Sequence, residues 1–107
     1  MEYISMDVAM KYLMNNKGIF YKVRDSFLDS YKTFEEDYKE LMEEQDLKGL
    51  ELYIHSIKGI SLNLGAEKLF ESSVQALGSI RKELWNLEDI TNFLTVLRCS
   101  YQELQSL

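Results

Sequence analysis

The residues of this chain that could do chemistry gather around its only histidine, His55. Lys58 follows the histidine by three positions and Gly59 by four, so on a helix the three lie on one face. A neutral imidazole can act as a nucleophile at pH 7, and a nearby ammonium can stabilise a phosphoryl group on its ring nitrogen. The three residues therefore indicate an exposed nucleophile with a cationic partner.

Gly59 needs its own explanation, because a glycine inside a helix costs roughly 1 kcal/mol relative to alanine. We interpret it as a gap that lets another surface come close to the imidazole. The alternative is that Gly59 lets another helix of the same chain pack closely, in which case a side chain there would overpack the core.

Helices must position these residues, since the apolar residues repeat with a helical period and the chain contains no proline. We expect a short helix from Ser5 to Met14, a long one from near Ile19 to Leu41, a third from Asp46 to Gly65, a fourth from Ala66 and a fifth from Asn86. The predicted fold is all-α: an antiparallel up-and-down four-helix bundle with a short extra N-terminal helix. Residues 1–107 form one domain.

The third helix carries an inner stripe of apolar residues, and His55 lies just off it on an outward or boundary face. The stripe comprises Leu50, Ile54, Ile57, Ser61 and Leu64. Glu51 and Leu62 are the neighbours of His55 one to two turns away, and we expect them with Gly59 to contact a partner. On the next segment, Leu84 is predicted to face inward and Trp85 to be partly buried.

Composition excludes several classes of function. A net charge of −6 argues against nucleic acid and against an acidic membrane surface as partners. The single cysteine, the lack of a signal segment and the lack of a long apolar run predict a protein of a reducing, cytoplasmic compartment. One histidine cannot supply the two Glu-x-x-His pairs of a bundle metal site. Cys99 is predicted to point away from the inner stripe, which disfavours a Cys-His hydrolase.

The run "HSIKGISLNLGA" closely resembles the signature of histidine-containing phosphotransfer (HPt) domains of multistep phosphorelays. The six positions that match are His55, Lys58, Gly59, Ser61, Gly65 and Ala66. The resemblance extends over the whole chain, because "VRDSFLDSYKTF" is similar to the preceding long helix of the family and "DLKGLELYIHSIKG" to its entry into the histidine helix.

This resemblance implies a phosphate carrier and not an enzyme. His55 would accept a phosphoryl group from the aspartate of one receiver domain and donate it to another, with Lys58 as its electrostatic partner and Gly59 as the gap that admits the receiver. The implied partners are receiver domains of response regulators and hybrid histidine kinases. No cofactor or metal of its own is implied, since the magnesium of the reaction belongs to the receiver. We expect a monomer, and Met1 favours a free-standing carrier.

The sequence departs from the family at one place, and one rival function remains open. Family members commonly carry Gln or Glu on the next helix near the histidine, whereas the corresponding position here is Leu77 or Gly78, and Gln75 is out of phase with it by about 200°. The rival is a non-catalytic helical-bundle adaptor or dimerisation module, which incorporation of phosphate would separate from a carrier.

Overall fold

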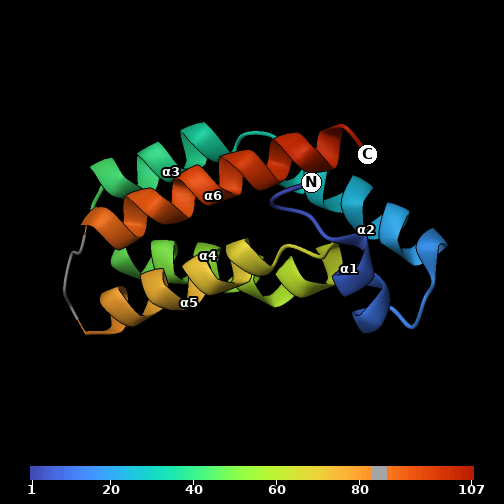
Figure 1. Ribbon diagram of the computed structural model, residues 1–107. Helices are drawn as coiled ribbons and strands as arrows, with labels where there is room; N and C mark the ends of the chain where they lie inside the picture. The colour runs from blue at the N-terminus through green and yellow to red at the C-terminus, as the bar shows by residue number, and fades with distance from the viewer. Residues whose placement is uncertain (83–86) are drawn as a thin grey trace.

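Six α-helices and one short 3₁₀ turn form the described part of the chain, which in this computed structural model is residues 1–82 and 87–107. The elements are α1 (Met6–Tyr12), α2 (Lys17–Ser30), α3 (Phe34–Glu43), α4 (Leu47–Ser61), η1 (Leu62–Leu64), α5 (Glu67–Arg81) and α6 (Leu87–Gln105). Figure 1 shows α3 and α6 in one layer and α4 and α5 in the other, with α1 and α2 at one end. The predicted all-α class is confirmed.

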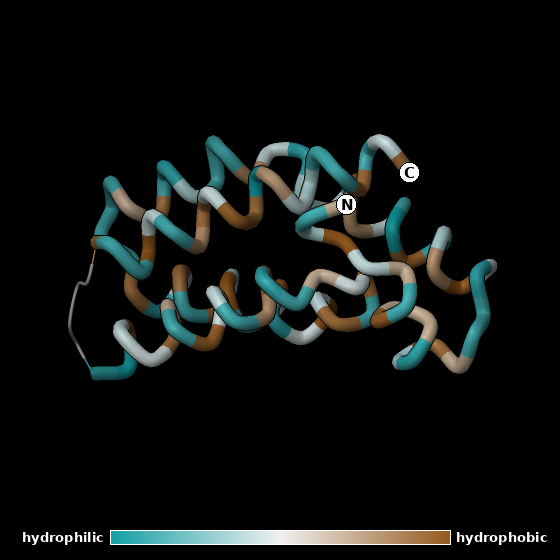
Figure 2. Tube along the Cα trace, in the orientation of Figure 1, coloured by the Kyte–Doolittle hydropathy of each residue, from teal (hydrophilic) through white to brown (hydrophobic). Residues whose placement is uncertain are grey.

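The core lies between the two layers, where Figure 2 shows the hydrophobic positions facing inward. α4 packs against α5, and α5 packs against α6, in the most extensive helix contacts of the molecule. Large side chains with less than 2% exposure fill the space: Phe20, Phe27, Leu50, Ile54, Ile57, Leu64, Leu69, Leu77, Ile90, Phe93, Leu97 and Leu104. The apolar stripe predicted for α4 is therefore buried. None of the helices among the described residues has the length and apolar character needed to span a bilayer.

Side-chain caps fix where three of the helices begin. Ser5 accepts a hydrogen bond from the N–H of Val8 at the start of α1, and Asp46 accepts one from Gly49 at the start of α4, as the sequence predicts. Asn16 caps α2, which begins at Lys17, two residues before the predicted start. The predicted starts of α1 and α4 are thus explained by short polar side chains that satisfy otherwise unpaired N–H groups.

The prediction of a single long second helix is wrong. The chain turns at residues 31–33 and divides that segment into α2 and α3. Tyr31 and Thr33 are weak helix formers, because aromatic and β-branched side chains lose χ1 freedom in a helix. The Thr33 hydroxyl donates to Asp37, and three acidic residues occupy the first turn of α3, where the helix dipole favours them. The turn lets α2 pack against η1 and α6, while α3 packs against α4.

Three residues that the sequence analysis assigned lie outside the described residues. These are Leu84, predicted to face inward, Trp85, predicted to be partly buried, and Asn86, the predicted cap of the last helix. The first described residue of that helix is Leu87, and the helix continues to Gln105.

The connection between α4 and α5 is held by the N-terminal segment of the chain. Gly65 ends η1 with φ of +71°, a left-handed conformation that glycine adopts without strain. The Ser5 N–H donates to the Gly65 carbonyl at 2.9 Å. The Glu103 carboxylate on α6 accepts from the N–H groups of Tyr3 and Ile4 and so ties this segment down. Gly65 therefore serves the connection between the helices.

Gly65→Ala is predicted to destabilise the protein, because a Cβ there would overlap the Ser5 carbonyl oxygen and occupy a left-handed conformation. We expect a loss of about 1 to 3 kcal/mol in the free energy of unfolding, measured by urea denaturation. Gly59→Ala is the control, and an equal loss in the two variants would contradict this role for Gly65.

Candidate functional site

His55 lies in the middle of α4 on the exposed face of the helix. Ile54 and Ile57 on the same helix are completely buried, and a step of about 100° per residue turns His55 away from them. Among the described residues, the imidazole ring has no hydrogen-bond or ion-pair partner. The exposed imidazole is thus accessible to a reactant from outside the protein.

Lys58 lies one turn from His55, but its ammonium is held by a ring on the neighbouring helix. The Lys58 Nζ lies 6.0 Å from the centroid of the Phe70 ring on α5. A cation–π contact at an exposed site is worth about 0.5 to 1 kcal/mol, so an anionic group on the nearby imidazole could compete for the ammonium. The sequence spacing predicted a cation near His55, but it did not indicate that Phe70 would hold it.

Gly59 is exposed, and a Cβ placed on it would meet nothing within 4 Å among the described residues. Close packing of another helix of the same chain on Gly59 is therefore excluded for the described residues. Because Gly59 has no side chain, the surface one turn from His55 is unobstructed. Of the two interpretations of Gly59, only the approach of another molecule's surface to the imidazole is left.

The stretch of α5 opposite His55 can be identified from two contacts between the antiparallel helices. Lys58 meets Phe70 at one end, and Glu51 forms an ion pair with Arg81 at the other, with 3.8 Å between Oε1 and Nε. Because His55 lies between the two α4 residues, the middle of α5 lies alongside it. That segment contains Gly78, where a Cβ would again meet nothing within 4 Å.

Two exposed apolar side chains lie in the same region. Leu52, three residues before His55, is 63% exposed, and Val74 in the middle of α5 is 45% exposed. Sequence reasoning missed Leu52, Val74 and Gly78 as surface features of the site. Spacing from His55 could have found Leu52, but Val74 and Gly78 required the register of α5 against α4.

The remaining positions of the motif have structural surroundings. Ser61 is completely buried and donates to the Ile57 carbonyl, and Ala66 is also buried. Leu62, a predicted docking residue, is half-buried in η1. Leu77, at the place where the family commonly carries Gln or Glu, is 1% exposed, whereas Gln75 is exposed on α5. Leu77 therefore cannot hydrogen-bond to the imidazole, since its side chain has no polar atom.

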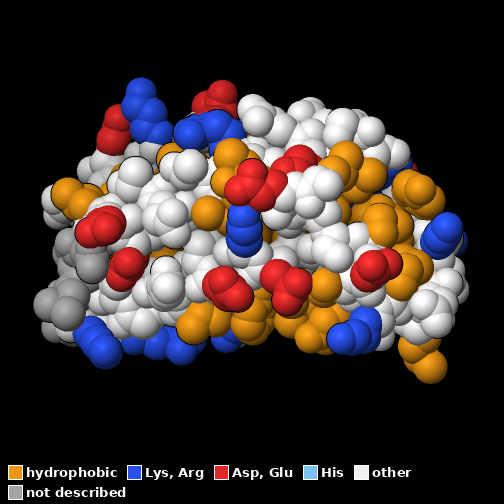
Figure 3. Space-filling model, in the orientation of Figure 1, with side chains coloured by type: hydrophobic (Ala, Val, Ile, Leu, Met, Phe, Trp, Pro, Cys, Tyr) orange, Lys and Arg blue, Asp and Glu red, His pale blue; other side chains and the backbone are white. Residues whose placement is uncertain are grey.

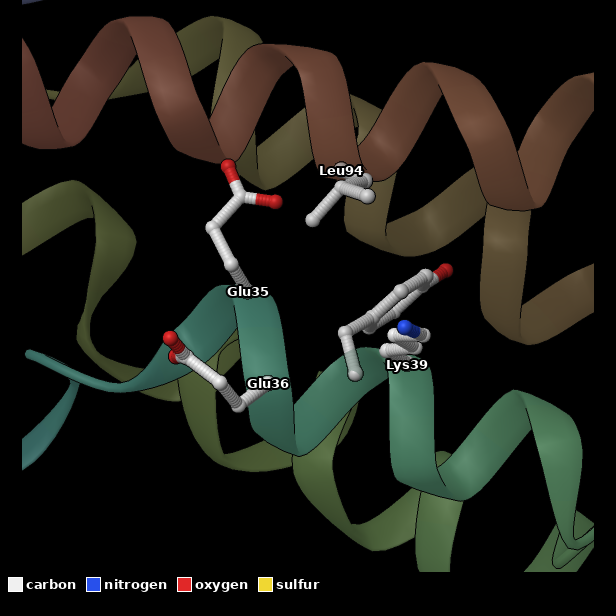
Figure 4. A pocket seen from close by; sticks show the side chains of 5 residues that line it. Glu35, Glu36, Lys39 and Leu94 are labelled. Carbon is white, nitrogen blue, oxygen red and sulfur yellow. The ribbon is translucent and has the colours of Figure 1, made fainter.

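A pocket on another part of the surface lies between α3 and α6 and does not include His55. Figure 4 shows Glu35, Glu36 and Lys39 on α3 and Leu94 on α6 around it. Arg98 donates to both Glu35 oxygens, at 2.6 and 3.0 Å, and this hydrogen bonding holds the pKa of the Glu35 carboxyl below its usual range. Glu35 is thus engaged in an ion pair between α3 and α6.

Cys99 and the carboxylates do not assemble a second reactive site with His55. Cys99 is half-buried on α6, where Tyr3 lies beside it. Among the described residues, no group of three or more His, Cys, Asp and Glu side chains is placed to hold a metal ion. The grouping that the structure does produce is the one around His55 on α4 and α5.

Comparisons of the chain with models of protein families, with curated proteins and with solved structures found no match.

Gly59→Ala and Gly78→Ala are predicted to leave the protein folded and to be neutral or stabilising, by up to roughly 1 kcal/mol each, because alanine favours the helix and the space is open. Urea denaturation of each variant measures this. A loss of more than about 1 kcal/mol at either position would mean that the glycine serves internal packing, which costs about that much when overpacked.

Proposed function

We propose that the protein is a histidine-containing phosphotransfer domain that carries a phosphoryl group on His55. The observation that supports this most strongly is the exposed, unpartnered imidazole in the middle of α4 with the bare Gly59 one turn away. A nucleophile for a small substrate is commonly found in a pocket. A nucleophile that must meet another protein's side chain needs an accessible ring and no obstruction around it, and both are present here.

The proposed reaction moves the phosphoryl group between side chains without net oxidation or reduction. The unprotonated nitrogen of the neutral imidazole attacks the phosphorus of a receiver's aspartyl phosphate, so a P–N bond forms while the acyl P–O bond breaks. The aspartate leaves as carboxylate with the bonding electron pair. In the second half-reaction, the carboxylate of another receiver attacks the phosphorus, and the imidazole leaves with the electron pair of the P–N bond.

Lys58 is proposed to stabilise the phosphorylated state. Its ammonium would leave the Phe70 ring for the phosphoryl oxygens, because a charge-assisted hydrogen bond is stronger than an exposed cation–π contact. Magnesium would be supplied by the receiver domain, and ATP is no substrate of the carrier. This makes the protein a phosphocarrier without kinase activity of its own.

The finer arrangement of the helices belongs to the same proposal. We propose that α4, α5, α6 and the bent α2–α3 segment form the four-helix bundle, with α1 as the short extra helix. The packing of α4 on α5, of α5 on α6 and of α3 on α4 supports this arrangement. The proposed setting is a cytoplasmic monomer that meets receiver domains of response regulators and hybrid kinases, with neither nucleic acid nor membrane as a partner.

His55→Gln is predicted to abolish phosphorylation while retaining the helical circular dichroism of the wild type. Incubation with a phosphorylated receiver domain should label the wild-type protein with an acid-labile, base-stable phosphate. Because the chain has one histidine, a phosphohistidine can form nowhere else. Label that persists in the variant would remove the proposal, and a wild-type protein that no receiver labels would favour the adaptor function instead.

Lys58→Ala is predicted to slow transfer, or shift its equilibrium, by a factor of a few to about a hundred, because loss of a charge-assisted hydrogen bond costs about 1.5 to 3 kcal/mol. The free energy of unfolding should change by less than about 1 kcal/mol. Lys39→Ala on α3 is the matched control. Equal kinetics for both variants in both directions would show that Lys58 does not contact the phosphoryl group.

A further inference from the structure

Acidic and basic side chains are unevenly distributed over the molecule, which the net charge of −6 does not reveal. Residues 31–46, which include α3, contain seven acidic and two basic side chains, whereas residues 47–82, which include α4 and α5, contain five basic and three acidic ones. In Figure 3, several Lys and Arg side chains lie along the lower left edge, at the layer of α4 and α5, and another group lies at the upper left. His55 therefore lies on a net-basic segment of an acidic protein. Residues 8–24, at the α1–α2 end, form another such segment, with four basic side chains and no acidic one.

Not all of these cations are available to a partner. Lys68 forms an ion pair with Glu2 at 2.9 Å and lies over the Tyr3 ring, and Lys58 lies over Phe70. Lys48 and Lys82 are exposed and have no ion-pair partner among the described residues. Lys48 lies two turns before His55, so it shares the same face of α4.

Arg81 forms only a long, exposed ion pair with Glu51. Its Nε lies 3.8 Å from the Glu51 carboxylate, and the two side chains are 55% and 41% exposed. Surface ion pairs of this kind contribute only about 0 to 1 kcal/mol, so another carboxylate can replace Glu51 at little cost. Arg81 is therefore held only weakly, by Glu51, which lies one turn before His55 on α4.

These charges border an apolar and sterically open area. We call a set of surface residues around the histidine on both helices the His55 surface; they are Lys48, Glu51, Leu52, His55, Gly59, Val74, Gly78, Arg81 and Lys82. Glu51 and Gly78 are half-buried and the others are exposed. Leu52 and Val74 provide the exposed apolar contacts. Gly59 and Gly78 have no side chain, so the helix surface beside them is open to a partner. An apolar centre with a charged rim is the usual anatomy of a protein interface.

We propose that the His55 surface docks a protein whose contact area has an apolar centre and an acidic rim, and that a carboxylate of this partner replaces Glu51 on Arg81. The inference rests on the proposed function, because it describes how a partner reaches His55. Charge complementarity favours such a partner, since the acidic α3 side repels it and the α4–α5 side attracts it, which orients the encounter. Arg81 and Lys48 are then positioning residues that set partner choice and association rate.

Transfer kinetics with a receiver domain that labels His55 test this inference. The probes are Arg81→Glu, the milder Arg81→Gln and Lys48→Glu, with Lys39→Glu on α3 as a control of equal charge change at another exposed cation. The second-order transfer rate is measured at low receiver concentration, and each rate is divided by the rate of labelling by phosphoramidate, a small donor that needs no docking. Circular dichroism checks that each variant is folded.

The Arg81 and Lys48 charge reversals should lower the normalised rate by about threefold to thirtyfold at low salt, and the Lys39 reversal by less than about twofold. The difference should shrink between about 20 and 300 mM salt as screening increases. Glu51→Gln, which releases Arg81, should raise the rate.

Two results would overturn the inference and leave the proposed function standing: equal effects of the Arg81 and Lys39 reversals, or a change of oligomeric state in light scattering that shows a second copy of the chain on this surface. Failure of every donor to label the wild-type protein would overturn both.

Discussion

The packing of α4 against α5 is the contact on which the rest of the structure depends. It requires Ile54 and Ile57 to be completely buried, and the helical period then turns His55 outward. The same packing sets the register of α5, so that Val74 and Gly78 lie along the exposed side near the histidine. One buried contact thus determines both the position of His55 and the surface around it.

Glycines on the two helices have opposite roles, which illustrates how the backbone context decides their meaning. Gly65 has a left-handed conformation and lies against the Ser5 carbonyl, so the fold requires it. Gly59 and Gly78 lie in ordinary helix with open space around them, so the fold would accept alanine at both. Helix stability alone gives no reason for these two glycines, whereas the proposed approach of a partner to His55 does.

Much of the fold could be predicted from the sequence because it follows from local rules. The capping residues Ser5 and Asp46 predicted the starts of α1 and α4. The helical period of the apolar residues in 50–64 predicted that His55 lies outside the core. The break at residues 31–33 could not be found in this way, because the apolar stripe runs through it. Tyr31 and Thr33 weaken the helix there, but the packing of α2 and α3 on different elements, which the sequence does not reveal, favours the turn. The Lys58–Phe70 contact and the Glu51–Arg81 pair depend on the register between two helices, which a single sequence does not specify.

The central claim is that His55 is a phosphoacceptor and that a docking protein reaches it because Gly59 places no side chain in the way. The Gly59→Gln variant tests this claim most directly. In-line attack needs the reacting atoms about 3 to 3.5 Å apart, and a glutamine one turn from the ring would hold a protein donor farther away. The measurement is the ratio of two labelling rates, one with a phosphorylated receiver domain and one with phosphoramidate. We predict that the ratio falls at least about tenfold in the folded variant, in keeping with the steep cost of misplacing reactants. An unchanged ratio would contradict the claim.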